Sequence, residues 1–145
     1  MIARLMLPQK LRDRLAAEAC TAFPRECCGL IEGQRAGDLA EVLDIHPVRN
    51  LAIEQDRFEL DPVEQFRLMR AMRVTGREIV GCYHSHPNGR AELSPRDREN
   101  AGEDDFVWLI VSVSANAAMT CSCHVVRKGM WSDLAIEVPT AESRA

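Results

Sequence analysis

The feature that most constrains the fold of this chain is an uncharged, mainly apolar run, FVWLIVSVS, at residues 106–114. A run that does not alternate apolar and polar positions is typical of a central strand that is covered on both faces. The run is too short to cross a bilayer as a helix. It therefore predicts a buried strand, with other elements of the chain packed against it.

Two segments carry the signals of longer helices. In residues 9–23 the apolar side chains recur with a helical period, which starts after Pro8 and ends at Pro24. The second segment, 61–76, has a full set of start and stop residues. These are Asp61 as N-cap, Pro62 at the first helical position, Glu64 as capping-box partner and Gly76 as stop.

Strand-like segments alternate with these helices. Besides 106–114 they are residues 1–7, 27–33, 38–48, 78–86, 119–129 and 131–139, with a short extended piece at 57–60 and a short third helix from Ser94 to about Glu103. This order predicts an α/β or α+β fold, with a mixed β-sheet in one layer and helices packed on it. We expect one domain at residues 1–138 and a flexible C-terminal tail at 139–145.

The composition excludes several classes of function. The 18 basic residues are scattered among 22 acidic ones, giving a net charge of −4, and aromatic residues are few. Because a phosphate backbone requires a basic surface, we expect no nucleic-acid partner. The N-terminal apolar stretch is short and broken by Arg4, so we predict neither a signal peptide nor a membrane anchor, and a cytoplasmic protein. The sequence leaves the oligomeric state open, and a homodimer is one state that it allows.

The six cysteines lack the spacing of a structural zinc site and, in a cytoplasmic chain, are expected to be free thiols. Cys121 and Cys123 would share one face of a strand as small core residues. Cys27 and Cys28 are adjacent on a strand, so we expect one in the core and one at the surface.

The stretch HSHPNGRAELSPRD, residues 84–97, contains side chains that could bind a metal ion. Side chains two apart on a strand share a face, so His84 and His86 project together. The Asn88-Gly89 turn lets the chain return, which would bring Asp97, in the first turn of the next helix, toward the strand end. Two histidines, one carboxylate and an open fourth position are the pattern of a catalytic rather than a structural zinc site.

Structural explanations exist for each half of this stretch. Ser94 and Asp97 are also good N-terminal capping residues around Pro95, and an H-x-H pair alone is a weak metal signal. Capping alone leaves the two histidines unexplained. A zinc hydrolase also needs a base that moves a proton from water to the leaving amine. Glu26, at the mouth of the strand CCGLIEG, is a candidate, although most glutamates are simply surface residues.

Together these residues resemble the JAMM or MPN-plus (Mov34/JAB) zinc metalloprotease family. Its pattern is an early Glu, then H-[ST]-H-P, seven residues, Ser, and an Asp three positions later. Glu26, HSHP at 84–87, Ser94 and Asp97 fill every position. PRECCGLIEG, RFELDP and GCYHSHP look like the small stand-alone prokaryotic branch, and the likeness covers roughly residues 3 to 127. Cys82, where many relatives have Trp, is a departure that would affect packing rather than the metal.

The resemblance implies a cytidine-deaminase-like α/β fold, one Zn²⁺ per chain and hydrolysis of peptide or isopeptide bonds. It implies that His84, His86 and Asp97 bind zinc, that Glu26 is general base and then acid, and that Ser94 stabilises the oxyanion. Tyr83 and Ser85 alternate to the other face and receive no catalytic role.

The implied substrate is a ubiquitin-like or sulfur-carrier protein that ends in Gly-Gly, cleaved after that tail to release an amino acid or an extension. A narrow cleft favours such an extended tail without side chains. Residues 50–58, with Asn50 and Phe58 as substrate-binding candidates, would form one wall of this groove, or else an ordinary connector.

Two other functions would share parts of this pattern. A catalytically silent scaffold of the same fold would be expected to lack some ligands, and this chain has them all. A zinc deaminase would carry H-x-E with P-C-x-x-C, neither of which occurs.

Overall fold

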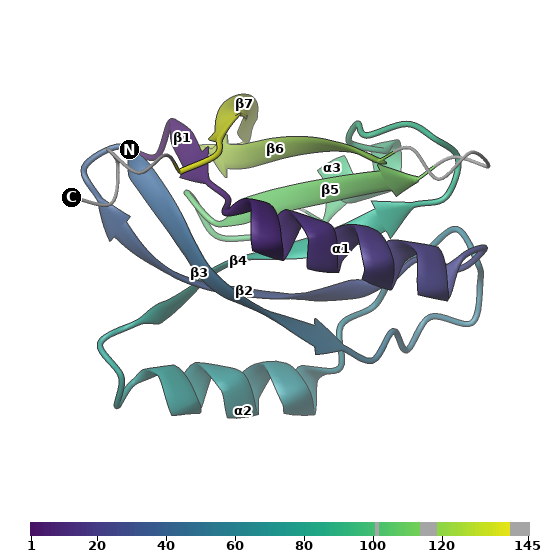
Figure 1. The fold of residues 1–145 in the computed structure, drawn as a ribbon, viewed down its shortest axis with the longest axis horizontal. Coiled ribbons are helices and arrows are strands. Elements are labelled where there is room, and N and C mark those ends of the chain that lie inside the picture. Colours follow the sequence, from purple (N-terminus) through teal and green to yellow (C-terminus); the bar gives the residue numbers. More distant parts are fainter. Residues whose placement is uncertain (101, 114–118, 140–145) are drawn as a thin grey trace.

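The computed structural model of this chain describes residues 1–100, 102–113 and 119–139. The elements follow one another as shown in Figure 1. They are β1 (Arg4–Met6), α1 (Gln9–Ala22), β2 (Cys28–Ala36), β3 (Leu39–Val48), α2 (Pro62–Met72), β4 (Glu78–His86), α3 (Pro95–Glu99), β5 (Val107–Val113), β6 (Met119–Arg127) and β7 (Met130–Glu137). The predicted order of strands and helices is therefore confirmed, whereas residue 114 and most of the predicted tail, 140–145, lie outside the described residues.

The sheet is mixed, as predicted, but it is not one open layer. Its strands are ordered β1-β3-β2-β4-β5-β6-β7 and form a closed barrel. Closure results from the short strand β1, which pairs in parallel with β3 on one side and with β7 on the other. A three-residue strand carries too little pattern to reveal that both of its edges are paired, so the expectation of a single layer was wrong.

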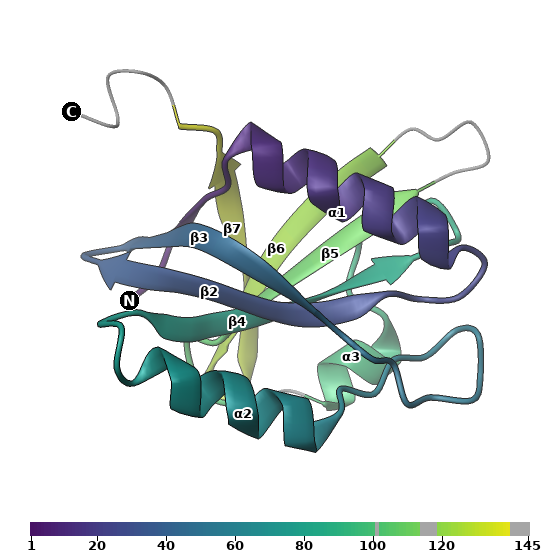
Figure 2. The same ribbon diagram turned by 60° about the horizontal axis from the view of Figure 1, so that its bottom comes forward.

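Helices α1 and α2 cover opposite sides of the sheet (Figure 2). On the α1 side, Leu11 and Leu15 pack into a core that includes Tyr83 and Leu109. On the α2 side, a smaller core of Leu30, Val48, Cys82 and Trp108 is covered by neighbours that include Leu68. All seven described residues of β5 are buried, which confirms the central strand that its apolar run predicts.

Coverage of both faces explains one wrong expectation about the cysteines. Cys27 and Cys28 do point to different sides of β2, but both are buried. Cys27 belongs to the core under α1, while the Cys28 thiol lies 3.5 Å from the carbonyl oxygen of Val48. Cys121 and Cys123 both contact the α1-side core, as predicted.

Asp61 caps α2 by accepting a hydrogen bond from the Val63 amide, as predicted. The prediction that Glu64 completes a capping box was wrong, because its side chain pairs with Arg67 instead, and α2 ends at Met72, before the predicted stop at Gly76. Helix α3 ends at Glu99, earlier than predicted. The piece at 57–60 makes only an isolated bridge between Asn50 and Leu60. Among the described residues, no helix has the length and apolar character needed to span a membrane.

Candidate metal centre

Two buried histidines meet at the end of β4. His84 and His86 have 0% and 7% of their surface exposed, and their Nε2 atoms are 3.0 Å apart. Tyr83 and Ser85 alternate to the other side, where the Tyr83 hydroxyl donates a hydrogen bond to Glu18 on α1 at 2.8 Å. The phenol passes so close to Gly29 that a Cβ at that position would lie 2.3 Å from it. A glycine is therefore required where the Tyr83 ring crosses β2.

The returning chain brings Asp97 to the histidines. Gly89 has a φ of +80°, which lets the chain turn after β4, and Ser94 then caps α3. The capping box is complete: the Ser94 hydroxyl accepts from the Asp97 amide, and the Asp97 carboxylate accepts from the Ser94 amide at 2.9 Å. The same carboxylate lies 3.2 Å from Nε2 of His84 and 3.3 Å from Nε2 of His86. Asp97 thus caps the helix and faces both imidazoles.

These three donor groups fit a metal ion. Ligand atoms bound tetrahedrally at about 2.0–2.1 Å lie about 3.3 Å from one another, and the observed separations are 3.0, 3.2 and 3.3 Å. Nδ1 of His86 lies 3.2 Å from the Arg90 carbonyl, so a neutral ring donates there and keeps its Nε2 lone pair. Lone pairs of nitrogen and carboxylate oxygen that face one another require a cation between them, either a proton or a metal.

Glu26 approaches the two histidines from the segment just before β2. Strands β2 and β4 pair antiparallel with Cys28 opposite His84, so the residue that precedes β2 by two positions lies at the His86 end of β4. Ligand atoms of Glu26, His84 and His86 lie within 4.8 Å of one another. The predicted convergence of Glu26 with the histidines is therefore present. Asp97 contacts both imidazoles directly, whereas Glu26 lies beside them and lines the same pocket.

Burial and charge shift the pKa values of these groups in different directions. Burial raises the pKa of Glu26 to about 7, with Asp97 and Asp56 adding to the shift and His86 opposing it. Burial also disfavours the charged form of Asp97, but hydrogen bonds from His84 and His86 outweigh it and hold the Asp97 pKa well below its usual range. An ionised carboxylate fixed between two imidazoles is suited to a positive charge.

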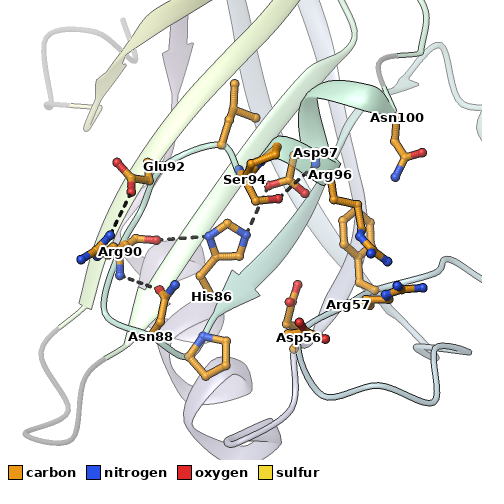
Figure 3. Close-up of a pocket in the computed structure, with 15 residues that line it drawn as sticks. Asp56, Arg57, His86, Asn88, Arg90, Glu92, Ser94, Arg96, Asp97 and Asn100 are labelled. Atoms are coloured by element: carbon orange, nitrogen blue, oxygen red, sulfur yellow. Dashed lines mark hydrogen bonds and ion pairs between the residues drawn. The ribbon is translucent and has the colours of Figure 1, made fainter.

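A pocket of about 390 Å³ opens over the centre (Figure 3). Glu26, His86 and Asp97 line it, together with Ser94 and Phe58. The Phe58 ring stacks on His84 with centroids 4.2 Å apart. The segment predicted as a groove wall therefore does contribute to the pocket.

Asn50 has a different surrounding. Its amide nitrogen donates to the carbonyls of Glu26 and Arg57, and its oxygen accepts from the amides of Ala52 and Glu59. These four bonds use the capacity of the side chain, and Asn50 does not line the pocket. It holds the loop against Glu26 and has no free group for a substrate.

Sequence reasoning missed other residues of this pocket. Asp56, Arg57, Arg90, Glu92, Arg96 and Asn100 also line it. Arg57 lies inside the expected wall segment, and Arg96 occupies the variable position of S-P-x-D, so neither carries a signal in the family pattern.

A second carboxylate–histidine cluster, Glu32 with Asp44 and His46, is already neutralised. Glu32 accepts from His46 at 2.8 Å and pairs with Arg77 at 2.5 Å, while Asp44 pairs with Arg14 at 3.0 Å. Guanidinium groups take the place that a cation would need, so this cluster is an ion-pair network of the fold.

The fold and the centre define a class of small α/β domain with a histidine–carboxylate site at a strand end. Residues 8–124 match the family described as prokaryotic homologs of the JAB domain, and the chain belongs to that family. This confirms the resemblance to the small stand-alone prokaryotic branch.

Individual relatives agree with this family assignment. A desampylase from Haloferax volcanii is 36% identical over 115 residues, covering 76% of this chain and 81% of that protein. A CysO-cysteine peptidase from Mycobacterium tuberculosis is 31% identical over 109 residues, covering 74% of this chain and 73% of that protein. A solved protein structure from Desulfitobacterium hafniense has a TM-score of 0.84 at 30% identity, covering 93% of this chain and 92% of the other.

Proposed function

We propose that this chain is a zinc-dependent peptidase that hydrolyses the amide bond after the C-terminal Gly-Gly tail of a ubiquitin-like or sulfur-carrier protein. The observation that carries the proposal is the meeting of His84, His86 and Asp97 at contact distance, with Glu26 beside them in a pocket. A silent scaffold has no need of this complete set. The donor set of two imidazoles and one carboxylate suits zinc.

His84, His86 and Asp97 would hold the ion. When bound, zinc would polarise the scissile carbonyl and make the attacking water more acidic. Glu26 is suited to take the proton of that water and return it to the leaving nitrogen, because its carboxylate lies beside the histidines in the pocket, where burial raises its pKa above the usual range. Water adds to the carbonyl carbon, the C–N bond breaks, and the nitrogen leaves as an amine.

Ser94 and Phe58 complete the site. The Ser94 hydroxyl accepts from the Asp97 amide, which leaves its own hydrogen free to donate to the developing oxyanion. Phe58, stacked on His84, holds that ring in place and forms part of the wall.

The substrate class is supported by relatives whose names are desampylase and CysO-cysteine peptidase. A Gly-Gly tail has no side chains to obstruct entry to a buried centre, which agrees with histidines that are 7% exposed or less. We further propose that the barrel is the cytidine-deaminase-like fold of the family. Six free cysteines agree with a protein that acts in the reducing cytoplasm.

The test combines metal content with proton transfer. Purified protein should carry about one zinc per chain by the single-site argument. Glu26→Gln should keep the zinc but lose cleavage, which is measured by mass spectrometry of carriers that end in Gly-Gly. Glu99→Gln, an exposed change on α3, is the matched control and should retain activity. Protein that binds no zinc even when it is supplied, or full activity of Glu26→Gln, would contradict the proposal.

A further inference from the structure

Two arginines on one wall of the pocket lack a close acidic partner. Arg57 precedes Phe58, and Arg96 lies on α3 directly before Asp97; both line the pocket. In Figure 3 their side chains project on the same side of the opening, across from Arg90 and Glu92. Within the described part of the chain, no carboxylate lies within 4.0 Å of Arg96, and Arg57 has only Glu54 at 3.7 Å.

Several other arginines in the described part of the chain differ from this pair. Arg4, Arg35, Arg77 and Arg127 each pair with a carboxylate at 3.1 Å or less. Across the pocket, Arg90 lies 3.9 Å from Glu92. Two guanidinium groups on one wall, balanced only by the 3.7 Å contact of Arg57 with Glu54, make that wall suited to an anion, because planar guanidinium groups bind carboxylates through paired hydrogen bonds.

The position of this wall narrows the choice of anion. The pocket places Arg57 and Arg96 around the same space as His86 and Asp97. If the leaving group is a single amino acid, its α-carboxylate is separated from the leaving nitrogen by one carbon atom, so it must lie close to the centre. A lysine linked through its side chain would bring an uncharged aliphatic chain to the same place. The wall would therefore favour the free amino acid.

We propose that Arg57 and Arg96 bind the α-carboxylate of the residue that is released, and so select carriers whose Gly-Gly tail is extended by a single amino acid with a free C-terminus. This inference rests on the proposed function. Hydrolysis converts the Gly carbonyl into a carboxylate and the leaving nitrogen into an amine, while the carboxylate held by the arginines is unchanged. The two arginines are specificity-determining residues and take no part in proton transfer.

The experiment compares three substrates of the zinc-loaded full chain. Each is the same ubiquitin-like carrier, whose Gly-Gly tail continues as alanine with a free carboxylate, as alaninamide, or as alanyl-alanine. Alanine is chosen because its side chain offers no metal ligand. We expect the single free carboxylate to lower KM about tenfold relative to the amide, the usual scale for a charge-assisted hydrogen bond. Arg57→Ala and Arg96→Ala should remove that preference by raising KM for this substrate alone.

Controls separate this role from others. Arg98→Ala, an exposed change on α3 outside the pocket lining, should behave as wild type, and Arg96→Lys should restore part of the preference. Thermal melting identifies any variant that fails to fold. In a separate binding measurement without turnover, NMR signals of arginine Nε–H groups should shift with added alanine and not with alaninamide, and Arg96→Ala should remove the responding signal.

The outcomes are distinct. Equal KM for the carboxylate and the amide in wild type overturns this inference and leaves the proposed function intact. A KM rise shared by all three substrates in the arginine variants overturns it too, since it would show that the arginines recognise acidic side chains of the carrier. Cleavage of no substrate overturns the proposed function and this inference with it.

Discussion

The hydroxyl of Ser85 accepts a hydrogen bond from the backbone amide of Cys27 at 2.8 Å, and the Ser85 amide donates to the Cys27 carbonyl at 3.0 Å. This pair joins the start of β2 to the end of β4. Ser85 points away from the metal centre, as strand alternation predicts, yet it fixes the residue next to Glu26. The H-x-H pattern thus contains, at its middle position, the contact that positions the proposed base.

Ser85→Ala should therefore reduce cleavage while zinc is retained. The change leaves the buried Cys27 amide without a partner, which costs about 1–3 kcal/mol of the free energy of unfolding, and it loosens Glu26 without touching a ligand. Urea unfolding, zinc analysis and cleavage rates measure the three effects. Ser132→Ala, exposed on β7, is the matched control. Loss of zinc in Ser85→Ala would show that the serine supports the histidines instead.

Asp97→Ala should cost metal affinity, because Asp97 contacts both imidazoles in addition to capping α3. Asp61→Ala, which removes the cap of α2, tests capping alone. Asp61→Ala should lower the free energy of unfolding by about 1 kcal/mol through the lost N-cap. Asp97→Ala should also lower it, through the lost carboxylate half of the α3 capping box, while Ser94 remains the N-cap. Only Asp97→Ala should weaken zinc binding in a competition titration with a chelator. Equal zinc affinity in the two variants would reduce Asp97 to a capping residue.

Much of this site was predictable because its signals are local. Alternation along β4 puts His84 and His86 on one face, and the S-P-x-D start of α3 brings back Asp97. Glu26 is separated from His84 and His86 by about sixty positions, and only the pairing of β2 with β4 shows that they meet. The family resemblance supplied that link.

Features that depend on distant packing were missed for the same reason. Closure of the barrel depends on two partners of β1, and the burial of Cys28 depends on cover from elements further along the chain. Arg57 and Arg96 come from separate segments that meet only at the pocket. Asn50 was assigned to substrate because it opens the loop, but its amide is used by the backbone of that loop.

Phe58→Ala should weaken zinc binding. The Phe58 ring covers His84, whose Nδ1 is buried without a hydrogen-bond partner among the described residues, so packing is what orients this imidazole. We expect zinc affinity to fall about tenfold, the lower end for loss of a contact that orients a ligand. The matched control is Phe66→Ala on α2, where the ring is exposed. Calorimetric titration with zinc compares them, and equal affinities would refute an orienting role for Phe58.

The ion pairs of Glu32 should make the free energy of unfolding depend on pH in the acidic range. Burial disfavours the Glu32 carboxylate, but hydrogen bonds from Arg77 and His46 outweigh it, so its pKa in the folded protein is lowered. A group with a lowered folded pKa stabilises the fold above its unfolded pKa, about 4.3 for glutamate, and that stabilisation is lost as the pH falls toward the folded value. Wild type should therefore lose more stability than Glu32→Gln between about pH 5 and pH 3.

Urea unfolding at several pH values measures this difference, and Glu59→Gln, an exposed change, should follow the wild-type curve.

The same samples distinguish an ion-pair network from a second metal site. Because Arg77 and Arg14 already neutralise Glu32 and Asp44, added zinc should stabilise wild type and Glu32→Gln equally, through the His84–His86–Asp97 centre. A zinc-dependent gain that disappears in Glu32→Gln would instead show that the cluster binds metal.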